Sequence, residues 1–216
     1  MGYAPENTLK SFRKALELNV DIIELDVHVC KSEELVVIHD DKVDRTTNGK
    51  GYVIEKTLEE LKSLNAGEGE KIPLLSEVLD IVNKQARINI ELKGTCTVEP
   101  IRDLVEEYVK NKGWEYEDFI ISSFNHYELK KFNKLNPDIE IGALITGIPV
   151  GFAEFAERVN ARYVNLCVEF INQEFVDDAH KRGLEVYVWT VNDSDDIEKM
   201  RSLNVDGIFS DFPDRL

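Results

Sequence analysis

The sequence predicts an α/β protein built around a parallel β-sheet. Apolar segments of strand length recur seven times, and segments with helical spacing of apolar residues separate them. The chain has 216 residues, of which 43% are hydrophobic and 31% charged, a composition that suits one well-packed domain over residues 1–216. Strands that alternate with helices over this length form either a doubly wound sheet or a closed TIM (β/α)8 barrel.

The order of these segments predicts where the sheet begins. The strands are expected at residues 21–27, 86–93, 118–124, 140–145, 162–166, 185–191 and 207–210, and the helices between them at 75–82, 98–109, 127–135, 152–159, 174–181 and 194–203. The chain opens on a helix that ends near Leu18, with Pro5, Asn7 and Thr8 as helix-start residues. A closed eight-unit barrel needs one more strand, so we expect the first strand to be missing.

One region interrupts the alternation of strands and helices. Residues 30–70 contain a short strand at 35–39, a turn-rich stretch and a short helix that starts with capping-box spacing at Thr57 and Glu60. We interpret this region as a small insertion after the second barrel strand.

Charge and composition exclude several classes of function. The formal net charge is -16, so a nucleic-acid backbone is not an expected partner. No segment approaches the roughly 18 uninterrupted apolar residues that a membrane span requires. The three cysteines, Cys30, Cys96 and Cys167, are widely spaced, which favours reduced thiols and a cytoplasmic location.

Two neighbouring strands carry acidic side chains where a barrel interior is expected. Side chains alternate along a strand, so Glu24 and Asp26 share one face near the strand's carboxyl end, and Glu91 and Lys93 share the corresponding face of the next strand. Grouped carboxylates resist ionisation unless a cation neutralises them, and oxygen ligands suit Mg²⁺ or Ca²⁺. A structural charge pair, with Lys93 bridging Glu24 and Glu91, is the alternative.

A histidine ends the inserted strand. His39 is followed by Asp40, and a histidine beside an acid can transfer protons near neutral pH. The alternative is a surface histidine in a turn.

Ordered motifs throughout the chain resemble those of the glycerophosphodiester phosphodiesterases. They are PENT (5–8), IELDV (23–27), VVIHDD (36–41), RTTNGKG (45–51), IPLLSEVL (72–79), INIELK (88–93), VWTVN (188–192) and DGIFSDFPD (206–214). The resemblance runs from residue 3 to the end and implies a phosphodiesterase-type TIM barrel.

The resemblance also implies a role for individual residues. Glu24, Asp26 and Glu91 would bind one divalent cation, Mg²⁺ or Ca²⁺, and His39 would be a catalytic histidine. Substrate contacts would come from Lys93 to the phosphate and from Trp189 and Phe124 beside the glycerol pocket. For Trp189, plain barrel packing is the alternative. The implied reaction is metal-dependent hydrolysis of a small glycerophosphodiester to an alcohol and glycerol phosphate, a step of glycerophospholipid metabolism.

One family motif has no counterpart in the chain. Members carry His-Arg-Gly at the end of the first strand, and only Met1, Gly2, Tyr3 and Ala4 precede the PENT run. The missing strand and the missing motif therefore coincide, and we expect impaired turnover because each general acid or base typically contributes about 10²- to 10⁴-fold. Unpaired barrel edges also favour self-association.

Two other functions remain open at this point. A non-catalytic barrel that binds glycerophosphodiesters fits the same motifs. An aldolase-like lyase, with Lys93 as a Schiff-base lysine at a strand end, is the third interpretation.

Overall fold

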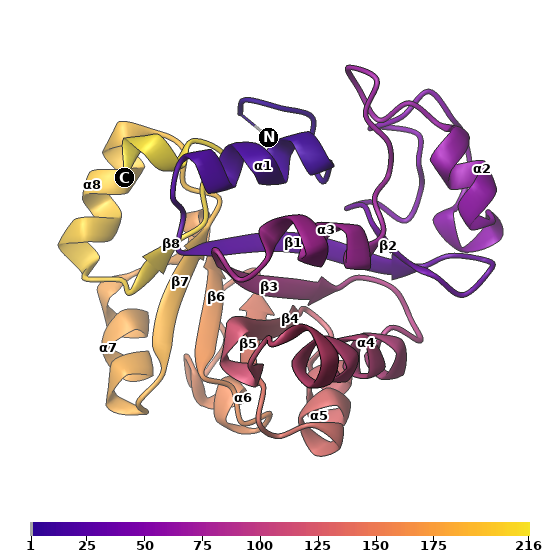
Figure 1. Ribbon diagram of the computed structural model, residues 1–216. Helices are drawn as coiled ribbons and strands as arrows, with labels where there is room; N and C mark the ends of the chain where they lie inside the picture. Colours follow the sequence, from indigo (N-terminus) through magenta and orange to yellow (C-terminus); the bar gives the residue numbers. More distant parts are fainter. Residues whose placement is uncertain (1) are drawn as a thin grey trace. The chain divides into compact units, whose positions relative to one another are not determined.

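The computed structural model describes residues 2–216, which form two compact units (Figure 1). The first unit ends at Phe119 and the second begins at Ile120.

The first unit contains three β-strands, with helices before, between and after them. Its elements are α1 (Leu9–Glu17), β1 (Ile22–Val29), β2 (Leu35–Val37), η1 (Val53–Glu55), α2 (Leu58–Ser63), α3 (Leu75–Val82), β3 (Arg87–Leu92), α4 (Val98–Lys112) and η2 (Tyr116–Asp118). Strand β1 lies in the middle, parallel to β3 and antiparallel to β2. Helices α1 and α3 contact each other and lie on the same side of β1 in Figure 1.

The apolar faces of β1 and β3 form part of the core. Leu25 in β1 and Ile88 and Ile90 in β3 are fully buried, as the alternation of their side chains predicts. Because β1 and β3 are parallel and pair Asp26 with Glu91, their polar residues meet at the same level of the sheet.

The segment between β1 and α3 folds around a small core of its own. That core consists of Cys30, Val36, Ile38, Val43, Val53, Leu61, Ala66 and Ile72. Thr57 and Glu60 form the predicted capping box at the start of α2. Strand β2 is shorter than expected and ends at Val37, but the backbone N–H of Ile38 still donates to the carbonyl of Asp26 at 3.0 Å. This hydrogen bond places His39 beside the acidic face of β1.

The second unit continues the repeat of strand and helix. Apart from Phe119, the first residue of β4, which belongs to the first unit, its elements are β4 (Phe119–Ser123), α5 (His126–Leu135), β5 (Glu140–Ile145), α6 (Glu154–Glu157), β6 (Tyr163–Cys167), η3 (Val168–Phe170), α7 (Gln173–Lys181), β7 (Glu185–Trp189), α8 (Ser194–Leu203), β8 (Gly207–Ile208) and η4 (Pro213–Arg215). Strands β4 to β8 pair in sequence order, and all four pairings are parallel.

The seven predicted barrel strands are confirmed in residues 2–216 as β1 and β3 to β8. The helix expected at 152–159 is wrong in extent, because α6 covers only Glu154–Glu157. Phe152 and Asn160 flank it with φ of 47° and 53°, in the left-handed region that a right-handed helix cannot continue through.

Two further features bear on the sequence-based expectations. Within residues 2–216, no helix combines the length and the apolar character that crossing a membrane requires. The three cysteines are free thiols, of which Cys30 is buried, Cys167 is partly buried and Cys96 is exposed.

Candidate active site

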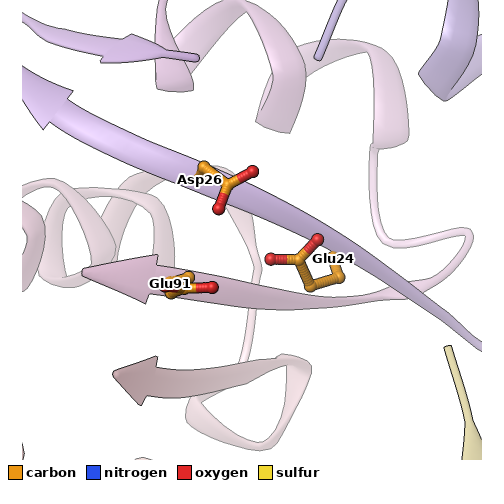
Figure 2. Close-up of side chains that lie close together, drawn as sticks. All are labelled: Glu24, Asp26 and Glu91. Carbon is orange, nitrogen blue, oxygen red and sulfur yellow. The ribbon is translucent and has the colours of Figure 1, made fainter. Parts of the chain in front are cut away.

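Three carboxylates converge on one face of the neighbouring strands β1 and β3. Glu24 and Asp26 come from β1 and Glu91 comes from β3, and Figure 2 shows the three side chains gathered on one side of these strands. One oxygen from each lies within 4.8 Å of the others. Asp26 and Glu91 are buried, at 4% and 8% exposure, and Glu24 is partly buried. The carboxylates predicted from strand alternation therefore do lie together.

The cluster is held in an environment that disfavours its full negative charge. Loss of hydration, followed by the charges of Asp26 and Glu91, raises the pKa of Glu24 well above its ordinary value. Burial also raises the pKa of Glu91, although the nearby ammonium of Lys93 opposes that shift. Positive charge supplied at this point would favour the ionised state of both groups.

Lys93 provides part of that positive charge. Its Nζ lies 2.9 Å from Glu91 Oε1 and 3.5 Å from Asp26 Oδ1. Burial alone would lower the pKa of Lys93, but Glu91 and Asp26 outweigh it and the pKa is raised. The predicted charge pair with Glu91 thus exists, while the second partner in contact is Asp26, not Glu24.

The donor set fits a hard divalent cation. Three carboxylates face one lysine, and the amide of Asn7 donates to Asp26 Oδ2 at 2.9 Å. One ammonium group leaves an excess of negative charge, and every candidate ligand atom is oxygen. Both properties suit Mg²⁺ or Ca²⁺ better than a softer metal.

His39 lies next to this cluster through Lys93. Its Nε2 is 3.4 Å from Lys93 Nζ, and its Nδ1 is 2.7 Å from Asp40 Oδ1. With Asp40 ionised, the Nδ1–H of a neutral ring donates to the carboxylate and Nε2 carries the lone pair. The side chain of His39 is half exposed.

Sequence reasoning missed the residues that support these groups. Arg45 joins Asp40 to Glu6, and Asn7 holds Asp26. The supporting residues lie in the PENT, VVIHDD and RTTNGKG runs. For Arg45, the charge in a turn-rich segment was the sequence feature that could have indicated a supporting role.

His28 has a supporting position. It is buried, and its Nε2 lies 3.2 Å from the backbone carbonyl oxygen of His39. Burial lowers the pKa of His28, so a neutral ring that donates from Nε2 to this carbonyl is favoured.

Phe124 and Trp189 form an aromatic pair in the second unit. Their ring centroids are 5.5 Å apart with perpendicular planes, and the indole Nε1–H of Trp189 donates to the carbonyl of Asn165 at 3.1 Å. Phe124 is exposed, whereas Trp189 is partly buried. Their contact with substrate stays a prediction.

Parallel α/β architecture and an oxygen-only cluster on two adjacent strands are typical of a barrel enzyme with a polar active site. The glycerophosphoryl diester phosphodiesterase family model matches residues 1–215, and the chain belongs to this family.

Individual relatives agree with that assignment. The chain is 41% identical to the glycerophosphodiester phosphodiesterase of Caldanaerobacter subterraneus subsp. tengcongensis, over 98% of this chain and 90% of that protein. Identity to the glycerophosphodiester phosphodiesterase of Bacillus altitudinis is 38%, over 99% and 92%. A phosphodiesterase of Oleispira antarctica, solved with the product sn-glycerol-3-phosphate, superposes with a TM-score of 0.88 at 31% identity, over 98% of this chain and 90% of that one. The predicted family and TIM-barrel fold class are confirmed.

Proposed function

We propose that this chain hydrolyses glycerophosphodiesters to an alcohol and glycerol phosphate, using a divalent cation bound by Glu24, Asp26 and Glu91. The observation that carries the proposal is the meeting of these three carboxylates within 4.8 Å, beside Lys93 and His39. The named activities of the relatives, and the glycerol phosphate product of the Oleispira antarctica enzyme, support the choice of substrate.

The residues of the site divide the work among them. Glu24, Asp26 and Glu91 would hold a divalent cation, which would supply positive charge for the phosphodiester and lower the pKa of a nearby hydroxyl. Besides the cation, the ammonium group of Lys93 supplies positive charge for the substrate phosphate. In the free protein this group contacts Glu91. His39 transfers a proton through Nε2, and Asp40 holds its Nδ1–H and stabilises the imidazolium form.

Hydrolysis of glycerophosphocholine and glycerophosphoethanolamine by the purified chain tests this function. We expect ³¹P NMR to show glycerol phosphate when Mg²⁺ or Ca²⁺ is present. A chelator should stop the reaction, and excess cation should restore it. A folded chain that forms no product with either cation would contradict hydrolysis, and substrate-induced thermal stabilisation of that chain would then identify the non-catalytic binder.

The lyase alternative is disfavoured by the environment of Lys93. A Schiff-base lysine needs a lowered pKa to supply a neutral amine, whereas Glu91 and Asp26 raise the pKa of this one. Borohydride should therefore not trap carbonyl compounds on the chain.

The reduced turnover expected from the sequence stays a prediction. Measuring kcat for this chain and the Bacillus altitudinis relative under the same conditions tests it. The cytoplasmic location, the self-association and the role in glycerophospholipid metabolism also stay predictions.

A further inference from the structure

An arginine outside the cluster of carboxylates connects two segments of the first unit. Arg45 donates from Nη1 and Nη2 to the carboxylate of Glu6 at 2.8 and 2.6 Å. It also donates from Nε and Nη2 to the carboxylate of Asp40 at 2.8 and 2.9 Å. One guanidinium group is thus gripped along two edges by carboxylates that lie 39 and 5 residues away in the sequence.

The contact with Asp40 acts on the orientation of that carboxylate. Oδ1 of Asp40 accepts from both Arg45 Nη2 and His39 Nδ1, and Oδ2 accepts from Arg45 Nε. A planar guanidinium bound to both oxygens fixes the plane of the carboxylate, which a single contact does not. The position of the oxygen that receives the Nδ1 proton of His39 is thereby determined.

The contact with Glu6 fixes the arginine itself. The side chain of Glu6 is only 13% exposed, compared with 49% for Arg45, so the more buried Glu6 anchors the more exposed Arg45. Asn7, the next residue, donates to the candidate metal ligand Asp26. Asn7 has φ 52°, in the left-handed region that asparagine tolerates. A two-residue segment therefore contacts both the arm that carries His39 and the carboxylate cluster.

We propose that Arg45 is a positioning residue for His39: through Asp40 it fixes the Nδ1-protonated tautomer and the ring orientation, and through Glu6 it anchors this arm beside the carboxylate cluster. The catalytic part of the proposal rests on the proposed function, but the tautomer of His39 is a property of the protein alone. Partners of this kind commonly change activity by roughly 10- to 100-fold when they are removed.

The test compares R45M, R45K and E6Q with a matched control, R182M. Arg182 makes the same kind of bridge in the second unit, binding Asp178 through two nitrogens and Glu157 through a third, without a histidine on either carboxylate. Long-range ¹H–¹⁵N NMR, with His39 assigned through H39N, reports the tautomer near pH 8. Steady-state hydrolysis of glycerophosphocholine reports kcat and KM separately.

We expect the wild-type His39 to be mainly Nδ1-protonated. In R45M the Nε2-protonated population should rise, and kcat should fall roughly 10-fold or more with little change in KM. R45K should recover part of both, and E6Q, which keeps the Asp40 contact, should show a smaller shift in the same direction. R182M should match the wild type in both.

An unchanged His39 tautomer in folded R45M overturns the proposal, whatever happens to activity. An equal loss of kcat in R182M also overturns it, because the effect would then be one of general stability. If R45M fails to fold, E6Q decides in the same way. If the wild type hydrolyses nothing, the proposed function fails while the tautomer comparison still stands.

Discussion

The two units share one structural repeat but differ in what they bury. Among residues 2–216, the buried acids, Asp26 and Glu91, and the buried histidine, His28, all lie in the first unit. The buried polar side chains of the second unit are neutral: Ser122, Ser123, Asn136 and Asn165. Burying a neutral polar group costs much less than burying an ionised carboxylate, and grouped carboxylates are costly without a cation. The difference locates the candidate chemistry on two adjacent strands of the first unit.

Loss of one carboxylate should give the largest effect. E91Q removes a proposed carboxylate ligand of the cation while keeping the shape of the side chain, and we expect hydrolysis to fall by at least about 100-fold, since a bound metal ion would provide several kcal/mol of charge stabilisation. E154Q, which changes an exposed glutamate of the second unit paired with Arg158, should stay close to the wild type. Full activity of E91Q would contradict the assignment of the candidate chemistry to the buried carboxylates of the first unit.

Replacement of His39 should separate proton transfer from cation binding. H39N is expected to lower kcat by roughly 10²- to 10⁴-fold, while cation affinity measured by calorimetry stays unchanged because His39 contacts Lys93 and not the carboxylates. H180N is the control, since His180 pairs with Asp206 in the second unit. If both variants lost activity equally, the result would contradict a specific role of His39 in proton transfer.

The aromatic pair tests what the second unit contributes. W189A should raise KM for glycerophosphocholine by roughly 5- to 10-fold, consistent with an aromatic contact of about 1 kcal/mol, with a smaller effect on kcat. F170A, at an exposed position in η3, should change neither constant. An unchanged KM in folded W189A would reduce Trp189 to barrel packing.

The smallest expected effect is on stability, and it should be alike in both units. Arg45 lowers the pKa of Asp40, and Arg182 lowers the pKa of Asp178. A carboxylate whose pKa is depressed by folding stabilises the protein above its unfolded pKa, about 4, and loses this contribution as pH falls through the folded value. D40N and D178N should each be less stable than the wild type at pH 7, by a margin that shrinks below about pH 4.

Denaturant unfolding at pH 7 and pH 3 measures both differences. If the loss of unfolding free energy in D40N were larger at pH 3 than at pH 7, it would contradict the predicted direction of the pH dependence. Because D178N serves as the counterpart of D40N, only D40N should also lower activity.

Sequence predicted most of the framework because strand and helix periodicities are local. The same alternation placed Glu24 and Asp26 on one face of β1 and Glu91 and Lys93 on one face of the next barrel strand, and the parallel register of β1 and β3 brings Asp26 opposite Glu91. A charge pair for Lys93 was also expected, but its second partner, Asp26, depends on side-chain geometry that periodicity does not specify.

The contacts of the supporting residues could not be predicted from the sequence, for a different reason. The contact between Arg45 and Glu6 spans 39 positions between two irregular segments, and no period relates them. Asn7 reaches Asp26 from a turn with φ 52°, a conformation that its neighbours in the sequence do not reveal. The extent of α6 was predicted wrongly for a similar reason, because left-handed residues on both sides of it end the helix despite its apolar spacing.

Calorimetric titration of Mg²⁺ and Ca²⁺ into the chelator-treated chain and its D26N variant tests the central claim most directly. The account predicts one cation bound per wild-type chain and its loss in D26N, with both proteins folded by circular dichroism. Absence of binding to the wild type, or equal binding to D26N, would contradict a cation site formed by the carboxylates of β1 and β3.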